Sequence, residues 1–164
     1  MRLLQHIWQS RPSLFDAVLV AAIWGAITPI CILADYFLGR EMLPPAVVPV
    51  TVIFGLGAFF AAPISLWLAQ IFVRQAIAAN FAVSFIVLGA STVGLTALVF
   101  AFDFWLYFVQ WHGEPFSKLW ANQLVFTFAS AIYQFLVSGV RLYLPCGLIA
   151  LGLASFWASH RIAR

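Results

Sequence analysis

The sequence predicts an all-α integral membrane protein with four transmembrane helices. The first observation is composition, since only 8% of the 164 residues are charged, against about 25% in soluble domains, and 65% are hydrophobic. The second is a series of uncharged stretches: residues 17–34, 42–73, 75–102, 119–140 and 142–160. A membrane-spanning helix needs about 20 such residues. Residues 1–164 therefore form a single transmembrane helical domain whose solvent is lipid.

Residues 1–11 precede the first long apolar segment and predict a short helix that lies in the membrane interface. One helical face carries the apolar residues Leu3, Leu4, Ile7 and Trp8. The opposite face carries the polar residues Arg2, Gln5, His6 and Gln9. Pro12 is expected to end this helix, and Ser13 with Asp16 three residues later resembles a capping box for the first span.

The distribution of basic residues predicts the number of spans and their direction. We expect spans near residues 14–38, 47–72, 80–103 and 140–159. One side of the membrane then collects five arginines, Arg2, Arg11, Arg74, Arg161 and Arg164. The other side keeps Arg40 and Lys118, so the arginine-rich side is predicted to be cytoplasmic, with both termini there. A fifth crossing would export the basic C-terminal tail.

Residues 117–139 form an amphipathic segment before the last span. Its polar residues recur at steps of three or four and so share one helical face: Gln123, Thr127, Ser130, Gln134 and Ser138. The segment is predicted to be a helix along the outer interface or a helical extension that stands out of the membrane. The polar face would then contact interfacial lipid and water, or a partner protein, and the sequence leaves both open.

Aromatic residues are concentrated around the end of the third span, between residues 100 and 120. Amphipathic rings of this kind gather at the level of the lipid headgroups. The sequence therefore predicts a lipid-interface belt formed by Trp105, Trp111 and Trp120. The alternative is a surface that contacts a specific lipid or a pigment.

Three ionisable residues fall near the outer ends of predicted spans: Asp35, Asp103 and Arg141. Counted from the cytoplasmic ends of their helices, all three lie roughly 27–35 Å up at about 1.5 Å per residue. Ionisable groups inside a membrane are costly and often functional. We expect Arg141 to pair with Asp35 or Asp103 and so to lock three helices together, and the alternative is a cluster that binds a solute or a proton.

Small residues share one face of each of the first three spans, which allows helices to approach closely in lipid. In the first span these residues are Ala17, Ala21, Gly25 and Thr28. In the second they are Ala58, Ala62, Ser65 and Ala69. In the third they are Ala90, Gly94, Ala97 and Ala101.

The sequence contains none of the patterns H-E-x-x-H, G-x-S-x-G or a phosphate-binding glycine loop. Cys31 and Cys146 have no metal-ligand spacing around them, and the basic residues form no nucleic-acid-binding stripe. We therefore expect no enzyme activity, catalytic residue, cofactor or metal. The expected partners are membrane lipids and other integral membrane proteins, without nucleic acid.

Short loops leave no room for a catalytic domain, whereas the polar and small-residue faces offer surface to other helices. The expected role is therefore a non-catalytic subunit, or an accessory or assembly factor, of a larger inner-membrane protein complex, as part of a hetero-oligomer. One alternative is a small homo-oligomeric transporter or channel for a solute or ion. Another is a membrane sensor that signals through a cytoplasmic partner.

Overall fold

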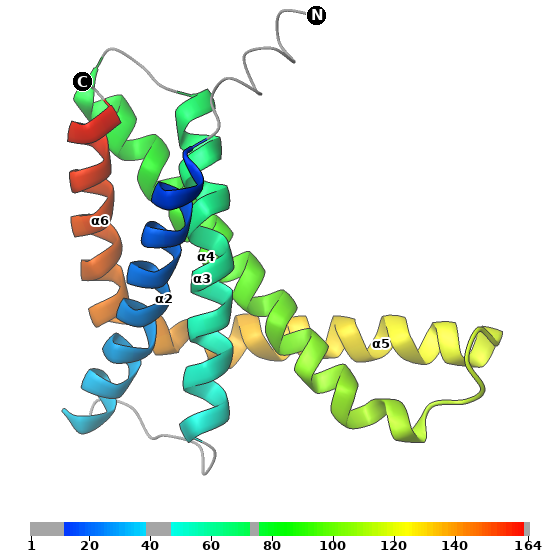
Figure 1. The fold of residues 1–164 in the computed structure, drawn as a ribbon. Helices are drawn as coiled ribbons and strands as arrows, with labels where there is room; N and C mark the ends of the chain where they lie inside the picture. Colours follow the sequence, from blue (N-terminus) through cyan, green and yellow to red (C-terminus); the bar gives the residue numbers. More distant parts are fainter. Residues whose placement is uncertain (1–11, 39–46, 73–75, 163–164) are drawn as a thin grey trace, which may run out of the picture.

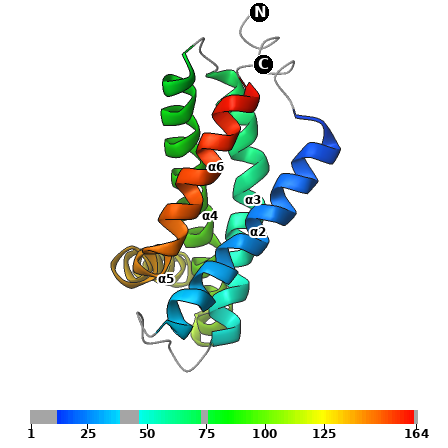
Figure 2. The ribbon, with the colours of Figure 1, turned by 90° about the vertical axis from the view of Figure 1, so that its left-hand side faces the viewer.

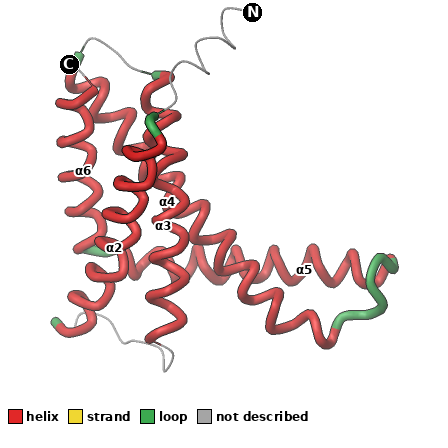
Figure 3. Tube along the Cα trace, viewed as in Figure 1, coloured by secondary structure: helices red, strands yellow, loops and turns green. Residues whose placement is uncertain are grey.

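The computed structural model describes residues 12–38, 47–72 and 76–162, and within these ranges it contains helices and turns but no strand (Figures 1 and 3). The elements are α2 (Leu14–Phe37), α3 (Val47–Ile71), α4 (Ile77–Phe108), the 3-10 turn η1 (Val109–Trp111), α5 (Lys118–Gln134), the π-helical turn η2 (Phe135–Gly139), the 3-10 turn η3 (Val140–Tyr143) and α6 (Cys146–Ile162). The predicted all-α fold is confirmed. Residues 1–11, where the interfacial helix is predicted, lie outside the described ranges.

Four helical segments are long and apolar enough to cross a membrane: Leu14–Phe37, Val47–Ile71, Ile77–Trp111 and Lys118–Tyr143. The protein is thus a multi-pass membrane protein, as the sequence predicts. The first two segments agree with the predicted spans to within one residue. A further apolar helix, Cys146–His160, is shorter than these four.

Helices α2, α3 and α6 and the first part of α4 run side by side as a bundle (Figures 1 and 2). α3 packs against both α2 and α4, and α6 packs mainly against α4. α2 begins and α6 ends at the same end of this bundle (Figure 1). α5 lies across the bundle direction, toward the opposite end.

The last two predicted spans differ from the observed helices. α4 runs from Ile77 to Phe108 and so exceeds the predicted range 80–103 at both ends. The predicted span 140–159 is not one helix, since α6 begins only at Cys146. Pro145 has no N–H group to continue a helix, and Leu144 before it is extended, with φ −106° and ψ 136°. The Leu144–Pro145 peptide bond is cis.

Length and composition favour residues 118–143 as the fourth crossing segment, whereas the arrangement of the helices favours α6. α6 runs along the bundle, and its 17 residues measure about 25 Å at ~1.5 Å per residue. Together with η3 it approaches the thickness of a hydrocarbon core, about 30 Å. α6 therefore runs along the bundle, whereas α5 lies across it.

Small residues allow α2, α3 and α4 to pack closely. On α3 the predicted small face is confirmed, because its residues are buried: Ala58, Ala62, Ser65 and Ala69. On α2, Ala21 and Thr28 are buried, and Ala17 and Gly25 are half-buried. On α4 the prediction is half wrong: Ala97 and Ala101 are buried, but Ala90 and Gly94 are exposed, because α4 turns a polar face toward the bundle there.

The end of α4 leaves the bundle together with α5 (Figure 1). The last buried residue of α4 is Ala101, and the next buried residue along the chain is Ala131. Residues 102–130 between them include no buried residue, although ten of them are aromatic. We call residues 102–138 the α4–α5 arm.

Candidate functional site

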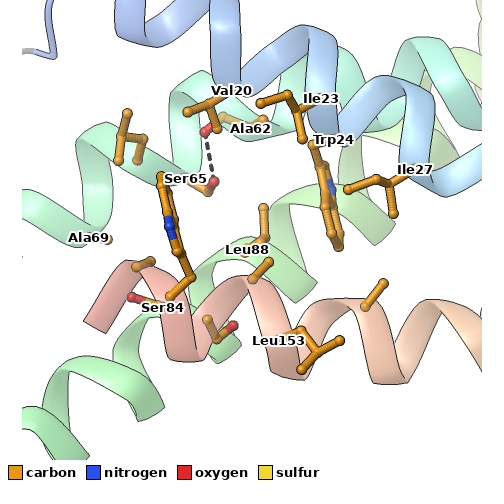
Figure 4. Close-up of a pocket in the computed structure, with 16 residues that line it drawn as sticks. Val20, Ile23, Trp24, Ile27, Ala62, Ser65, Ala69, Ser84, Leu88 and Leu153 are labelled. Atoms are coloured by element: carbon orange, nitrogen blue, oxygen red, sulfur yellow. Dashed lines mark hydrogen bonds between the residues drawn. The ribbon is translucent and has the colours of Figure 1, made fainter. Parts of the chain in front are cut away.

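A cavity of about 580 Å³ lies inside the half of the bundle where α2 begins and α6 ends (Figure 4). Four helices form its wall. α2 contributes Val20, Ile23, Trp24 and Ile27. α3 contributes Ala62, Ser65, Leu66 and Ala69, and α4 contributes Ser84 and Leu88. α6 contributes Ala150, Leu153, Ala154, Ser155, Trp157 and Ala158.

The cavity has an apolar interior and a mouth that faces outward between α2 and α6. Trp24 and Ala62 are 6% and 0% exposed, so they lie at the interior. Ile23, Leu153 and Trp157 are more than half exposed, so they lie at the mouth. None of the lining residues carries a charge. The cavity therefore opens toward the surrounding lipid and offers a molecule from the membrane an uncharged pocket.

Three serines supply the polarity of the cavity wall. The Ser65 hydroxyl donates to the carbonyl oxygen of Ala62 on its own helix, at 2.7 Å (Figure 4). The Ser84 and Ser155 hydroxyls are buried and have no hydrogen-bond partner in the part of the chain that the structure describes. These two hydroxyls come from α4 and α6, and both residues line the cavity.

No family model, no curated protein and no solved structure matches this chain. Its function is therefore argued from the arrangement of its own residues.

A polar face on α4 holds the bundle around the cavity. Asn80, Ser84, Thr92 and Thr96 are buried and recur at intervals of four or eight residues, which places them on one side of the helix. The indole N–H of Trp24 on α2 donates to Thr92 Oγ1 at 2.9 Å. The Tyr143 hydroxyl in η3 donates to Thr96 Oγ1 at 2.7 Å. α4 is thus bonded to α2 and to η3 through the side chains of Thr92 and Thr96. These residues are not among the predicted site residues, although their spacing of four is visible in the sequence.

Asp35, Asp103 and Arg141, which are predicted to form one cluster, lie in different environments. Asp35 is 2% exposed, and its carboxylate accepts a hydrogen bond from the backbone N–H of Cys146 at 3.2 Å. Asp103 and Arg141 are exposed, so the ion pair predicted for Arg141 stays a prediction. The N-terminus of α6 carries free N–H groups and the positive end of the helix dipole, so it meets the carboxylate where arginine was expected.

The predicted polar face of residues 117–139 is divided between two environments. Gln123 Oε1 accepts a hydrogen bond from Gly113 N at 2.8 Å, and Thr127 Oγ1 lies 3.2 Å from His112 Nε2. These two half-buried residues thus contact the turn that follows α4, and their contact with a partner stays a prediction. The other members of the face, Ser130, Gln134 and Ser138, are exposed.

The predicted belt tryptophans all lie on the α4–α5 arm. Trp111 is 59% exposed, whereas Trp105 and Trp120 are half-buried. Each contacts a neighbouring ring: Trp105 contacts Phe102, Trp111 contacts Tyr107 and Trp120 contacts Phe116, with ring centroids 5.5, 5.3 and 5.6 Å apart. Their contact with lipid headgroups stays a prediction.

Proposed function

We propose that the protein is a non-catalytic subunit or accessory factor of a larger inner-membrane complex, and that the α4–α5 arm contacts a partner protein. One observation carries this proposal: residues 102–130 include no buried residue, although ten of them are aromatic. A helical hairpin with this composition offers a large surface that its own chain leaves uncovered. Aromatic residues are also enriched where proteins contact one another.

The arm is held in one shape before any partner binds. Ser117 caps α5 by accepting a hydrogen bond from Trp120 N at 3.1 Å, and Gln123 bonds Gly113 across the turn. At the inner end Phe135 is 2% exposed and stacks against Phe54 of α3, with ring centroids 5.7 Å apart. A surface that is already ordered loses little conformational entropy on binding, which favours its use as a contact.

Ser130, Gln134 and Ser138 give the arm a polar strip with no buried partner. Polar side chains of this kind hydrogen-bond across helices in membranes, at about 0.6 kcal/mol each in measured cases. They therefore suit a contact with a second transmembrane protein better than a contact with hydrocarbon.

The basic residues support an orientation with both termini in the cytoplasm. An even number of crossings agrees with the positions of the α2 start and the α6 end at the same end of the bundle (Figure 1). The arm then lies on the outer side of the membrane. A non-catalytic role is supported by the cavity wall, in which no acid, base or histidine accompanies the serines.

The experiment is copurification from mild detergent with Ser130, Gln134 and Ser138 replaced together by leucine. We expect the recovery of the copurifying subunit to fall roughly twentyfold, because three interhelical hydrogen bonds are worth about 1.8 kcal/mol. The matched control replaces the exposed alanines Ala26, Ala78 and Ala82 of the bundle by leucine, which adds apolar volume away from the arm. A wild-type protein that purifies without a stoichiometric partner, or a partner retained by the triple variant, contradicts the proposal.

A further inference from the structure

We propose that the cavity between α2, α3, α4 and α6 binds a neutral lipid that carries carbonyl oxygens, and that Ser84 and Ser155 donate hydrogen bonds to those oxygens. This inference is independent of the arm and of any partner protein. It rests on the size of the cavity, on the two hydroxyls and on the absence of charge from the lining residues.

The size of the cavity suits one small molecule or one lipid chain. Its volume of about 580 Å³ lies within the range of small-ligand sites, about 300–1,000 Å³. An α-helix with its side chains is about 10 Å wide, and four helices already wall the cavity, so a further helix does not fit. The occupant is therefore a chain or a ring that enters from the lipid, through the mouth at Ile23, Leu153 and Trp157.

The two serines differ from three other hydroxyl-bearing residues of the bundle. A serine or threonine in a helix commonly donates to a carbonyl one turn earlier. Ser65, Thr28 and Ser159 do so, with oxygen distances of 2.7, 3.0 and 2.7 Å. Ser84 and Ser155 are 5% and 0% exposed, and within the described residues their hydroxyls have no hydrogen-bond partner, so both O–H groups lack an acceptor.

The lining residues define the charge and shape of the occupant. None of them is charged, so an ionised phosphate or carboxylate would lose its hydration without compensation. Carbonyl oxygens are neutral acceptors that two hydroxyl donors can satisfy. Trp24 is held in place by its bond to Thr92, and Trp157 lies at the mouth, so the cavity offers aromatic surface to a flat ring. Isoprenoid quinones and diacylglycerols both supply neutral carbonyl groups on long chains.

The test measures binding of decylubiquinone to the full-length protein in phosphatidylcholine nanodiscs, by quenching of tryptophan fluorescence. We expect saturable quenching, and we expect Ser84→Ala and Ser155→Ala each to weaken binding roughly fivefold, which corresponds to about 1 kcal/mol. Decylbenzene, which has no carbonyl, should compete equally well with the wild type and with both serine variants. Competition by dioleoylglycerol distinguishes the two classes of lipid. If dioleoylglycerol competes more strongly than decylbenzene, the cavity binds an ester lipid. If it competes more weakly, the cavity binds a quinone.

Two substitutions of alanine by leucine distinguish binding in the cavity from binding elsewhere on the protein surface. Ala154→Leu places three more carbons in the cavity wall and should abolish saturable quenching, whereas Ala129→Leu on the exposed arm should leave it unchanged. The serine variants keep the test valid if Ala154→Leu does not fold. Quenching that never saturates, or saturable quenching that both serine variants leave unchanged, overturns the proposal.

Discussion

Replacing Gly57 by alanine is expected to separate α3 from α4 and to lower the thermal stability of the protein strongly. A Cβ atom at Gly57 would lie 2.5 Å from Thr96 Cα and 2.7 Å from Thr96 Cβ. Side chains that meet a neighbouring backbone this closely cannot be relieved by a change of rotamer, so the helices have to move apart. Overpacking costs about 1–3 kcal/mol of the free energy of unfolding. Displacement of Thr96 should also weaken the hydrogen bond that it accepts from Tyr143.

Gly94 provides the matched control for this substitution. It lies on α4, it is exposed, and a Cβ atom there would meet nothing within 4 Å. Gly94→Ala should leave the stability unchanged or raise it by up to about 1 kcal/mol, because alanine favours the helix. The measurement is the midpoint of thermal unfolding in detergent, which is monitored by circular dichroism. Equal midpoints for Gly57→Ala and Gly94→Ala would show that α3 and α4 do not approach as described.

Replacing Asp35 by alanine is expected to have the second largest effect, through the start of α6. The carboxylate is buried, and it accepts a hydrogen bond from Cys146 N where α6 begins. Hydrogen bonds to charged groups are worth about 1.5–3 kcal/mol, and the helix N-terminus also loses its nearby negative charge. Asp35→Asn retains an acceptor oxygen without the charge, so it should recover part of the loss.

Two further substitutions discriminate this role of Asp35 from the predicted ion pair. Arg141 and Asp103 are exposed, so Arg141→Ala and Asp103→Ala should each change the free energy of unfolding by no more than about 0.5 kcal/mol. The same thermal unfolding measurement applies. If Arg141→Ala were as destabilising as Asp35→Ala, the arginine would be the partner of the aspartate after all, and the bond to α6 would be secondary.

The sequence predicted the helices well where apolar runs end at charges or turn residues. Ser13 caps α2 as expected, since its hydroxyl accepts from Asp16 N at 3.1 Å. α4 is longer than the predicted span, because Asp103 is exposed beyond the bundle and does not interrupt the helix. The last predicted span begins before the observed helix α6, because Pro145 has no N–H group with which to continue a helix.

The candidate site was harder to predict, because it depends on contacts between residues far apart in the sequence. The bond from Trp24 to Thr92 and that from Cys146 to Asp35 follow from how three helices pack, and no local pattern specifies them. The buried polar face of α4 was readable as a spacing of four and eight residues. The cavity itself arises from the shapes of four helices together, which the order of residues along one helix does not reveal.

The proposals for the arm require α5 to lie on the outer side of the membrane and not to cross it. The deciding measurement uses single cysteines at Lys118 and at Ser138, near the two ends of the α5–η2 segment, after Cys31 and Cys146 have been replaced by alanine. Both positions are exposed, so a membrane-impermeant maleimide reports the side on which each one lies. We predict that the reagent labels both cysteines from outside the cell. A cysteine at Ser138 that reacts only from the cytoplasmic side would make residues 118–143 a membrane crossing, export the C-terminus and contradict the account.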